Sequence, residues 1–268
     1  MPAGDVIKIS SPATREFWEI PVVFEDEHLL AVDKPSGLLT SPDRHDLGRT
    51  SLITLLHAAI AEGKPWALEH NRKYLANAHR LDAETSGILL LAKSKEVLVK
   101  LADQFSANQP LKRYVALING APTADKFEVD VRIAPHPTKP GVVHVDKRYG
   151  KKSRTRFEVL EKFRNQTLLR CEPFTNHAHQ IRVHLRWAKL PVVGDALYHG
   201  APLKLSRLKK RYTVKEGEVE RPLMARVALH ADELTLPHPV TGEMLTIKAE
   251  WPKDFAVAMK YLRRYGSY

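Results

Sequence analysis

Residues 79–92 read HRLDAETSGILLLA, a polar run that passes directly into an apolar one. The apolar part, residues 88–92, is short and rich in isoleucine and leucine, which predicts a buried β-strand. Gly87 permits a tight backbone just before that strand, and two hydroxyl residues precede the glycine. The stretch therefore places the Asp82 carboxylate on a loop beside a rigid strand, a frequent position for catalytic groups. Without further information, a role for Asp82 as a simple turn cap fits these residues at least as well as a catalytic role.

Outward from this stretch, hydrophobic periodicity predicts the remaining elements. We expect helices over residues 51–61, 94–105, 180–188 and 253–264, and strands over residues 29–32, 113–118, 127–133, 143–145, 157–159, 229–236 and 244–249. The pattern at 180–188 also allows a strand, and helix is the preferred interpretation. Most strands follow one another in sequence, which predicts an α+β fold with a largely antiparallel, mixed central sheet and flanking helices.

The chain of 268 residues shows no internal repeat, low-complexity tract or linker. We therefore expect one globular domain over residues 20–268, preceded by an irregular lead-in at residues 1–19. The N-terminus lacks the apolar segment of a secretory signal, and no run approaches ~20 apolar residues. These features predict a cytoplasmic protein with no membrane partner, and we take a monomer as the default state.

The chain carries 42 lysines and arginines against 31 acidic residues, a formal net charge of +11. A basic surface attracts polyanions, of which RNA, DNA and anionic membranes are the candidates. Two stretches concentrate the charge, residues 147–156 and residues 199–226, and we expect the second to form a long exposed loop. A solvated charged loop is the alternative to a nucleic-acid contact. The candidate contacts in these stretches are Lys151, Lys152, Arg154, Lys209, Lys210 and Arg211.

Cysteine and histidine give little support to a metal site. Cys171 is the single cysteine, so no intrachain disulfide and no cysteine-based zinc cluster can form, and its apolar neighbours predict a core position. His177, His179 and His184 lie close in sequence, but their spacing fits no strong zinc pattern. We expect no metal, and stoichiometric metal in the purified protein would overturn this.

The stretch HRLDAETSG resembles the signature of the RluA-type pseudouridine synthases, whose fixed positions are His-Arg-Leu-Asp, then Thr-Ser-Gly after two variable residues. Other segments resemble further family elements in the same order. These are the lysine-proline-x-glycine turn at 33–38, the tyrosine motif at 112–116, the third motif at 179–185, the glycine-aspartate segment at 193–198 and a leucine-histidine-alanine element at 229–231. The resemblance covers roughly residues 20–250. It implies the pseudouridine synthase catalytic fold, with too few residues ahead of it for an N-terminal S4-like domain.

The resemblance also implies roles. Asp82 matches the catalytic aspartate, Tyr114 the tyrosine that packs on the target base, and Arg182 the basic residue that pairs with the aspartate. The RNA contacts implied beside them are His79, Arg80, Lys112 and Arg113. Residues 176–178, Asn-His-Ala, replace the Gly-Arg-Thr that usually opens the third motif. Because Arg182 is intact, we expect this departure to affect the choice of target uridine and not the chemistry.

Pseudouridine formation breaks the N1–C1′ bond of a uridine, turns the uracil and rejoins it through C5. No redox step or phosphoryl transfer takes part, so the resemblance implies no cofactor. Asp82 either attacks C1′ or removes the C2′ proton, and the sequence leaves both mechanisms open. Ribosomal and transfer RNA both remain candidate substrates.

Two other functions fit parts of the sequence. A glycosidase would need a second carboxylate, for which Glu84 is the candidate at a variable, exposed position. An inactive RNA-binding protein or RNA chaperone fits the charge and fold equally well, but it has no need for Asp82, Tyr114 and Arg182 together. We expect the loop at 199–226 to influence target choice, so that deleting it would alter RNA affinity or target choice more than the fold.

Overall fold

The computed structural model describes residues 5–12, 14–43, 48–212, 214 and 217–267. The chain forms two compact units, residues 1–112 with 231–249 and residues 113–230 with 250–268. We call them the first and the second unit. That residues 20–268 act as one catalytic domain stays a prediction.

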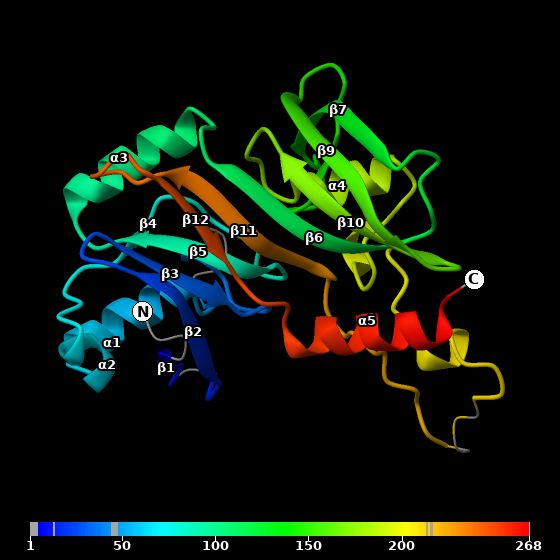
Figure 1. Ribbon diagram of the computed structural model, residues 1–268, viewed down its shortest axis with the longest axis horizontal. Coiled ribbons are helices and arrows are strands. Elements are labelled where there is room, and N and C mark those ends of the chain that lie inside the picture. Colours follow the sequence, from blue (N-terminus) through cyan, green and yellow to red (C-terminus); the bar gives the residue numbers. More distant parts are fainter. Residues whose placement is uncertain (1–4, 13, 44–47, 213, 215–216, 268) are drawn as a thin grey trace. The chain divides into compact units, whose positions relative to one another are not determined.

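The first unit is built on a sheet in which β1 (Val6–Ser10), β2 (Phe17–Glu25), β3 (Leu29–Lys34) and β5 (Ser86–Ala92) are antiparallel neighbours (Figure 1). Strand β4 (Ala76–Asn77) also pairs with β5. Strand β11 (Leu229–Pro237) follows β5 in the sheet and forms a hairpin with β12 (Met244–Lys248). The helices of this unit are α1 (Leu52–Ala61), α2 (Pro65–Glu69) and α3 (Lys95–Ser106).

Strand β5 is apolar without alternation because both of its faces are covered. Leu89 and Leu91 pack in one cluster with residues of α1, whereas Ile88 and Leu90 pack in another with residues of α3. A strand that is half exposed would alternate apolar and polar residues, and one buried on both sides does not. The Ser94 hydroxyl caps the N-terminus of α3 by accepting a hydrogen bond from the amide of Val97.

The expectation of an irregular lead-in is wrong where the structure describes that segment. Residues 6–10 form β1 and β2 begins at Phe17, while residues 1–4 lie outside the described part. Ile7 and Ile9 are buried and Lys8 between them is exposed, which is the alternation of an edge strand with one buried face. The strand was missed because this alternation extends over only a few residues.

The second unit contains five strands in the order β6-β10-β9-β7-β8, counted over the described residues, with antiparallel pairing throughout. Their bounds are β6 (Leu111–Asn119), β7 (Lys126–Pro135), β8 (Val143–Val145), β9 (Lys151–Lys162) and β10 (Gln166–Pro173). The predicted helices are confirmed as α4 (Gln180–Trp187) and α5 (Lys253–Tyr265). With these elements the α+β prediction, a largely antiparallel sheet with few helices, is confirmed.

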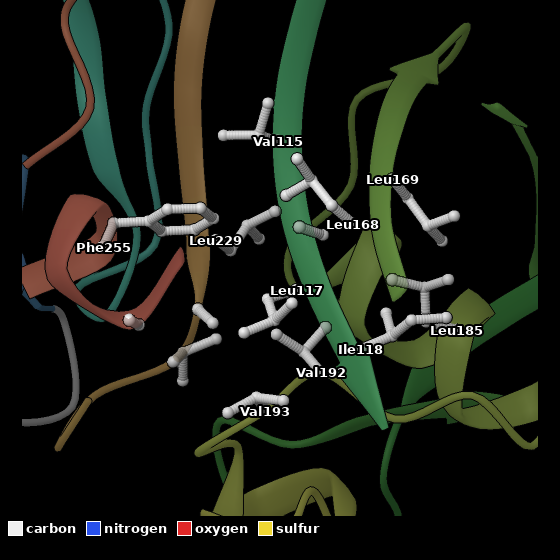
Figure 2. Packing of buried hydrophobic residues seen from close by; sticks show 14 of the residues in the cluster. Val115, Leu117, Ile118, Leu168, Leu169, Leu185, Val192, Val193, Leu229 and Phe255 are labelled. Atoms are coloured by element: carbon white, nitrogen blue, oxygen red, sulfur yellow. The ribbon is translucent and has the colours of Figure 1, made fainter. Parts of the chain in front are cut away.

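One large core stabilises the second unit. Figure 2 shows Ile118 of β6 beside Leu185 of α4, and Leu229 beside Phe255 of α5, all in one buried cluster. Cys171 belongs to the same cluster and is fully buried, so the prediction of a core cysteine is confirmed. Burial of this kind contributes roughly 1.5–3 kcal/mol for each large apolar side chain.

The loop at 199–226 is less detached from the core than expected. Leu203, Leu208 and Met224 are buried in the same apolar cluster, and the backbones of Leu203 and Met224 form an isolated antiparallel bridge. A short 3-10 turn (Leu205–Arg207) lies between two of these anchors. Deleting the whole loop would therefore uncover part of the core, so deletion does not separate target choice from fold as we expected.

Within the described residues, no helix has both the length and the apolar character needed to cross a membrane.

Candidate active site

The loop that carries Asp82 lies directly before β5, with the aspartate half-buried. Residues 34–40 hold this loop from one side. The Thr40 hydroxyl donates to the carbonyl of Leu81 over 2.9 Å and accepts from the amide of Leu81 over 3.1 Å. The amide of Gly37 donates to the carbonyl of Ala83 over 2.7 Å. The backbone on both sides of Asp82 is therefore fixed by hydrogen bonds, which restricts where its carboxylate can lie.

A buried lysine reinforces this support. Lys34 has no solvent exposure, and its ammonium donates to the carbonyls of Pro35, Leu38 and Ala83 over 2.8, 2.7 and 3.3 Å. An ammonium group away from water is costly unless its donors are satisfied. Lys34 thus joins the early lysine-proline-x-glycine turn to the Asp82 loop. The resemblance included this lysine but gave it no role.

Gly87 explains the end of the signature. Its backbone φ is +118°, and a Cβ atom there would lie 2.2 Å from the carbonyl oxygen of Ala231. Any larger residue would push β11 away from the start of β5. The hydroxyl of Thr85 is buried and has no hydrogen-bond partner among the described residues.

His79 is placed as a structural residue, which corrects its assignment as an RNA contact. It is 8% exposed, stacks on Phe105 at 4.6 Å between ring centroids, and accepts a hydrogen bond from the amide of Leu90 at Nε2. Burial lowers the pKa of His79 to about 3, and the positive charge of Lys112 acts in the same direction. The imidazole is therefore neutral at physiological pH and unable to offer charge to a phosphate.

Lys112 and Arg113 also differ from the expectation of exposed RNA contacts. Lys112 is 6% exposed, burial lowers its pKa to about 8, and its ammonium has no hydrogen-bond partner among the described residues. Arg113 is half-buried and its Nε donates to a carboxylate oxygen of Glu172 over 2.7 Å. Lys112 is thus withdrawn from the surface, and the charge of Arg113 is already paired with a carboxylate.

In the second unit, Arg182 is held by a carboxylate that the sequence analysis did not single out. Arg182 is 1% exposed and Asp195 is fully buried. The arginine donates from Nε and Nη2 to the two oxygens of Asp195 over 2.7 and 2.9 Å, a bidentate pair. The glycine-aspartate segment at 193–198 contained the signal for Asp195, but the resemblance assigned it no function.

Tyr198 supports this ion pair. The guanidinium carbon of Arg182 lies 5.1 Å from the centroid of the Tyr198 ring, within the range of a cation–π contact. The Tyr198 hydroxyl accepts from the amide of Val143 over 3.1 Å and is 2.9 Å from Nδ1 of His179. Asp195 is also the N-cap of the 3-10 turn Ala196–Tyr198. The orientation of the guanidinium is therefore set from two sides.

The start of the third motif anchors α4 to β9. Gln180 donates from Nε2 to the carbonyl of Arg154 and to the hydroxyl of Thr155 over 3.1 and 3.0 Å. Nε2 of His177 lies 3.0 Å from the carbonyl of Lys152. The departure at 176–178 thus contacts the basic strand β9.

Tyr114 lies half-buried on β6, opposite Cys171 of β10, where it packs against the core.

The other predicted RNA contacts lie at the surface. These are Arg80, Lys151, Lys152, Arg154, Lys209, Lys210 and Arg211, all exposed. Arg154 differs from the rest because its guanidinium binds the carboxylate of Glu128 over 2.6 Å. Glu84, the second carboxylate of the glycosidase alternative, is half-buried rather than exposed as expected.

The three histidines considered as metal ligands make separate contacts. Nε2 of His184 lies 2.8 Å from the Ser153 hydroxyl, while His177 and His179 bind a carbonyl and Tyr198. Among the described residues, the ligand atoms close enough to share an ion belong to Asp5, Glu25 and His70. Arg72 already binds both of those carboxylates.

Comparison with known proteins places the chain in a family. Residues 28–187 match the RNA pseudouridylate synthases. A ribosomal large subunit pseudouridine synthase D of Nitrosomonas europaea is 36% identical over 91% of this chain, which spans 65% of that protein's length. A dual-specificity RNA pseudouridine synthase RluA of Haemophilus influenzae is 32% identical over 86% of this chain and 93% of that protein's length. The structure of human RNA pseudouridylate synthase domain containing 4 superposes with a TM-score of 0.68, at 25% identity, over 90% of this chain and 92% of that one.

The chain therefore belongs to the RNA pseudouridylate synthase family, enzymes that act on uridine in RNA. The resemblance carried by residues 79–87 is confirmed.

The buried imidazole of His79 predicts a stability that falls in acid. In the unfolded chain a histidine titrates near pH ~6.5, whereas the pKa of folded His79 is about 3, so only the unfolded state gains the proton between these values. Its contribution is complete above pH ~6.5 and falls by about 2 kcal/mol between pH 7 and pH 5. Urea unfolding at the two pH values measures this decrease.

Histidine 184, whose pKa burial lowers to about 4, contributes in the same sense. The variant His79→Gln should therefore keep only part of the acid sensitivity, although its stability at pH 7 is lower. The variant His199→Gln, at an exposed position, serves as control and should behave like the wild type. An equal decrease in acid for His79→Gln and the wild type would contradict the assignment.

The buried pair of Arg182 and Asp195 predicts a second effect. Asp195→Ala leaves the guanidinium buried without its carboxylate and should lower the free energy of unfolding by about 3–5 kcal/mol. Glu128→Ala, which removes an exposed partner of Arg154, is the matched control and should have a small effect. Urea unfolding compares the two variants, and equal effects would refute the importance of the buried pair.

Arg182→Lys keeps the charge but loses the bidentate geometry, so turnover should fall on the order of 100-fold.

Proposed function

We propose that this protein isomerises uridine to pseudouridine in structured RNA, with Asp82 as its essential catalytic residue. The observation that carries the proposal is the support of the Asp82 loop. Hydrogen bonds from Lys34, Gly37 and Thr40 fix the backbone on both sides of a half-buried carboxylate. A carboxylate that only capped a turn would not need a segment some 40 residues away in the sequence to position it.

The chemistry assigns Asp82 one of two steps. Its carboxylate either forms a bond to C1′ as the N1–C1′ bond breaks, or it removes the C2′ proton so that a glycal forms. In both cases the uracil turns, C5 bonds to C1′, the C5 proton is released and N1 takes up a proton. The C1′–O bond to Asp82 breaks as C5 bonds in the first route, and C2′ regains its proton in the second. The target base must first leave its stack, at a cost of a few kcal/mol. Both routes require the ionised carboxylate.

Tyr114 and Arg182 are proposed to act with Asp82. Tyr114 offers an aromatic face to the flipped base and removes the C5 proton. Arg182, oriented by Asp195, supplies a positive charge that favours the ionised form of the catalytic carboxylate. Neither role needs a redox centre or a phosphoryl acceptor, so the proposed reaction requires no cofactor.

Ribosomal RNA of the large subunit is the first substrate to test. The Nitrosomonas europaea relative is named for that substrate, and the Haemophilus influenzae relative is named as dual-specific. The exposed side chains of Arg80, Lys151 and Lys152 are proposed phosphate contacts, and transfer RNA is the second candidate substrate. We also propose that the protein acts as a monomer in the cytoplasm.

The central test is release of tritium from RNA labelled at C5 of uridine. Forming the new glycosidic bond expels the label to water, so the wild type should release tritium from ribosomal RNA. Asp82→Asn keeps the shape of the side chain but not its charge, and should lower the rate of tritium release by about 100- to 10,000-fold. Asp103→Asn, an exposed aspartate of α3, is the matched control and should release tritium normally.

The outcomes separate the candidate functions. Free uracil among the products would favour a glycosidase. RNA binding without tritium release from ribosomal or transfer RNA would favour the inactive RNA-binding protein. Equal release by the wild type and Asp82→Asn would refute the role of the aspartate.

The tip of the basic loop provides a separate test of RNA binding. Lys209, Lys210 and Arg211 are exposed, while the loop's anchors are buried elsewhere, so replacing all three by glutamine should leave the fold intact. If they bind phosphates, RNA affinity should fall and the slope of log K against log salt should decrease by about 1 for each phosphate that is no longer bound. Filter binding at several salt concentrations measures both quantities. An unchanged slope would exclude the loop from the interface.

A further inference from the structure

The second unit contains a groove that neither Asp82 nor the Arg182–Asp195 pair explains. It has a volume of about 500 Å³ and lies between β8, the end of α4 and the 3-10 turn Ala196–Tyr198. Its floor is apolar, formed by Val143, Val183 and Tyr198. The size falls within the roughly 300–1,000 Å³ that is usual for sites of small ligands.

An exposed tryptophan lies at the rim of this groove. Trp187, the last residue of α4, is 48% exposed although tryptophan usually buries most of its surface. The ammonium of Lys147 lies 5.1 Å from the centroid of its ring. Leu197, also at the rim, is 42% exposed. Single exposed apolar residues are common, but here they border a cavity.

The charges around the groove have one sign. Lys139, Arg186 and Lys189 line it together with three histidines, and no carboxylate is among its described lining residues. None of these three cations has an acidic partner within the part of the chain that the structure describes. On the outer face of β9, by contrast, Arg154 and Arg156 share Glu128. The groove is thus a place where positive charge is not neutralised by the protein.

Two of the basic residues occupy positions that would suit glycine better. Lys189 follows the C-cap of α4 with a φ of +63°, and His199 caps the 3-10 turn with a φ of +65°. Helices commonly end in this left-handed conformation on glycine, because other side chains are strained there. The chain tolerates the strain at both places and keeps a basic side chain beside the groove.

We propose that this groove binds an unpaired nucleotide of the substrate RNA, outside the target uridine, with its base stacked on Trp187 and its phosphates beside Arg186 and Lys189. An aromatic face combined with unpaired cations and no acid is the combination that binds single-stranded RNA. The inference rests on the proposed function in that RNA is the substrate. It adds a second place where that RNA is held.

The groove is also linked to the candidate catalytic arginine. Val143, in the floor, donates its amide to the Tyr198 hydroxyl, and the Tyr198 ring packs against the Arg182 guanidinium. A nucleotide in the groove would therefore press on the residue that orients Arg182. Binding of RNA there would help to fix the catalytic geometry before the reaction.

The test compares RNA affinity and tritium release in three variants. Trp187→Ala should weaken binding of a large-subunit ribosomal RNA fragment by about 5- to 150-fold, the decrease expected for one base–aromatic stack, whereas Trp187→Phe should stay close to the wild type. Arg186→Gln with Lys189→Gln should decrease the salt slope by about 1 for each phosphate that is no longer bound. Fluorescence anisotropy at several salt concentrations provides both readouts, and circular dichroism checks the fold.

The control removes the same charge elsewhere. Lys100→Gln with Lys260→Gln, at exposed positions on α3 and α5, should leave RNA affinity, salt slope and tritium release unchanged. If the control weakens binding as much as the double groove variant, overall charge explains the effect and the site is refuted. If Trp187→Ala folds and binds RNA like the wild type, the stack is refuted. Should Trp187→Ala not fold, the double charge variant decides by its salt slope.

The proposal and the proposed function fail in different ways. Tritium release by the wild type together with unchanged binding in the groove variants would refute the groove alone. Trp187-dependent RNA binding without tritium release would refute the isomerase and keep the groove. Trp187-dependent binding of polyglutamate but not of RNA would indicate an acidic protein partner and overturn the proposal, as would a wild type that binds no RNA.

Discussion

The buried ammonium of Lys34 is the interaction on which the architecture of the Asp82 loop depends. It donates to carbonyls of its own turn and to Ala83, which follows it by 49 residues in the sequence. A charge without solvent is tolerated only where its donors are satisfied, so the turn and the loop must come together when the unit folds. Strand β5 then continues from the loop with both faces buried. The position of the carboxylate is therefore a consequence of core packing.

The second unit uses a similar device with a different pair of residues. The guanidinium of Arg182 is planar and presents two parallel N–H donors, which Asp195 matches with its two oxygens. The same carboxylate caps the 3-10 turn that carries Tyr198 beneath the guanidinium. In each unit a buried charged group holds a candidate catalytic residue. Several residues of the family motifs thus have structural roles.

This division explains how far the sequence could predict the site. Periodicity identified α1, α3, α4 and α5 and most strands, because their apolar patterns are local. The family motifs led to Asp82 and also suggested His79 and Lys112 as RNA contacts. Both are buried, and burial follows from distant segments that a local pattern does not contain. Asp195 was not singled out for the same reason, as its role exists only when α4 and the following turn pack together.

Net charge alone is a poor guide to where RNA would bind. The chain has 42 lysines and arginines, yet many of the arginines are neutralised by carboxylates within the fold. Arg113 binds Glu172, Arg226 binds Asp254 and Arg263 binds Glu161. Lys151, Lys152, Lys189, Lys209 and Lys210 have no such partner among the described residues. Arginine suits internal pairing because of its rigid fork, and lysine remains strongly hydrated at the surface. Because counterions are released only where phosphates meet unpaired charge, the salt dependence of RNA binding should follow this smaller set of residues and not the total charge.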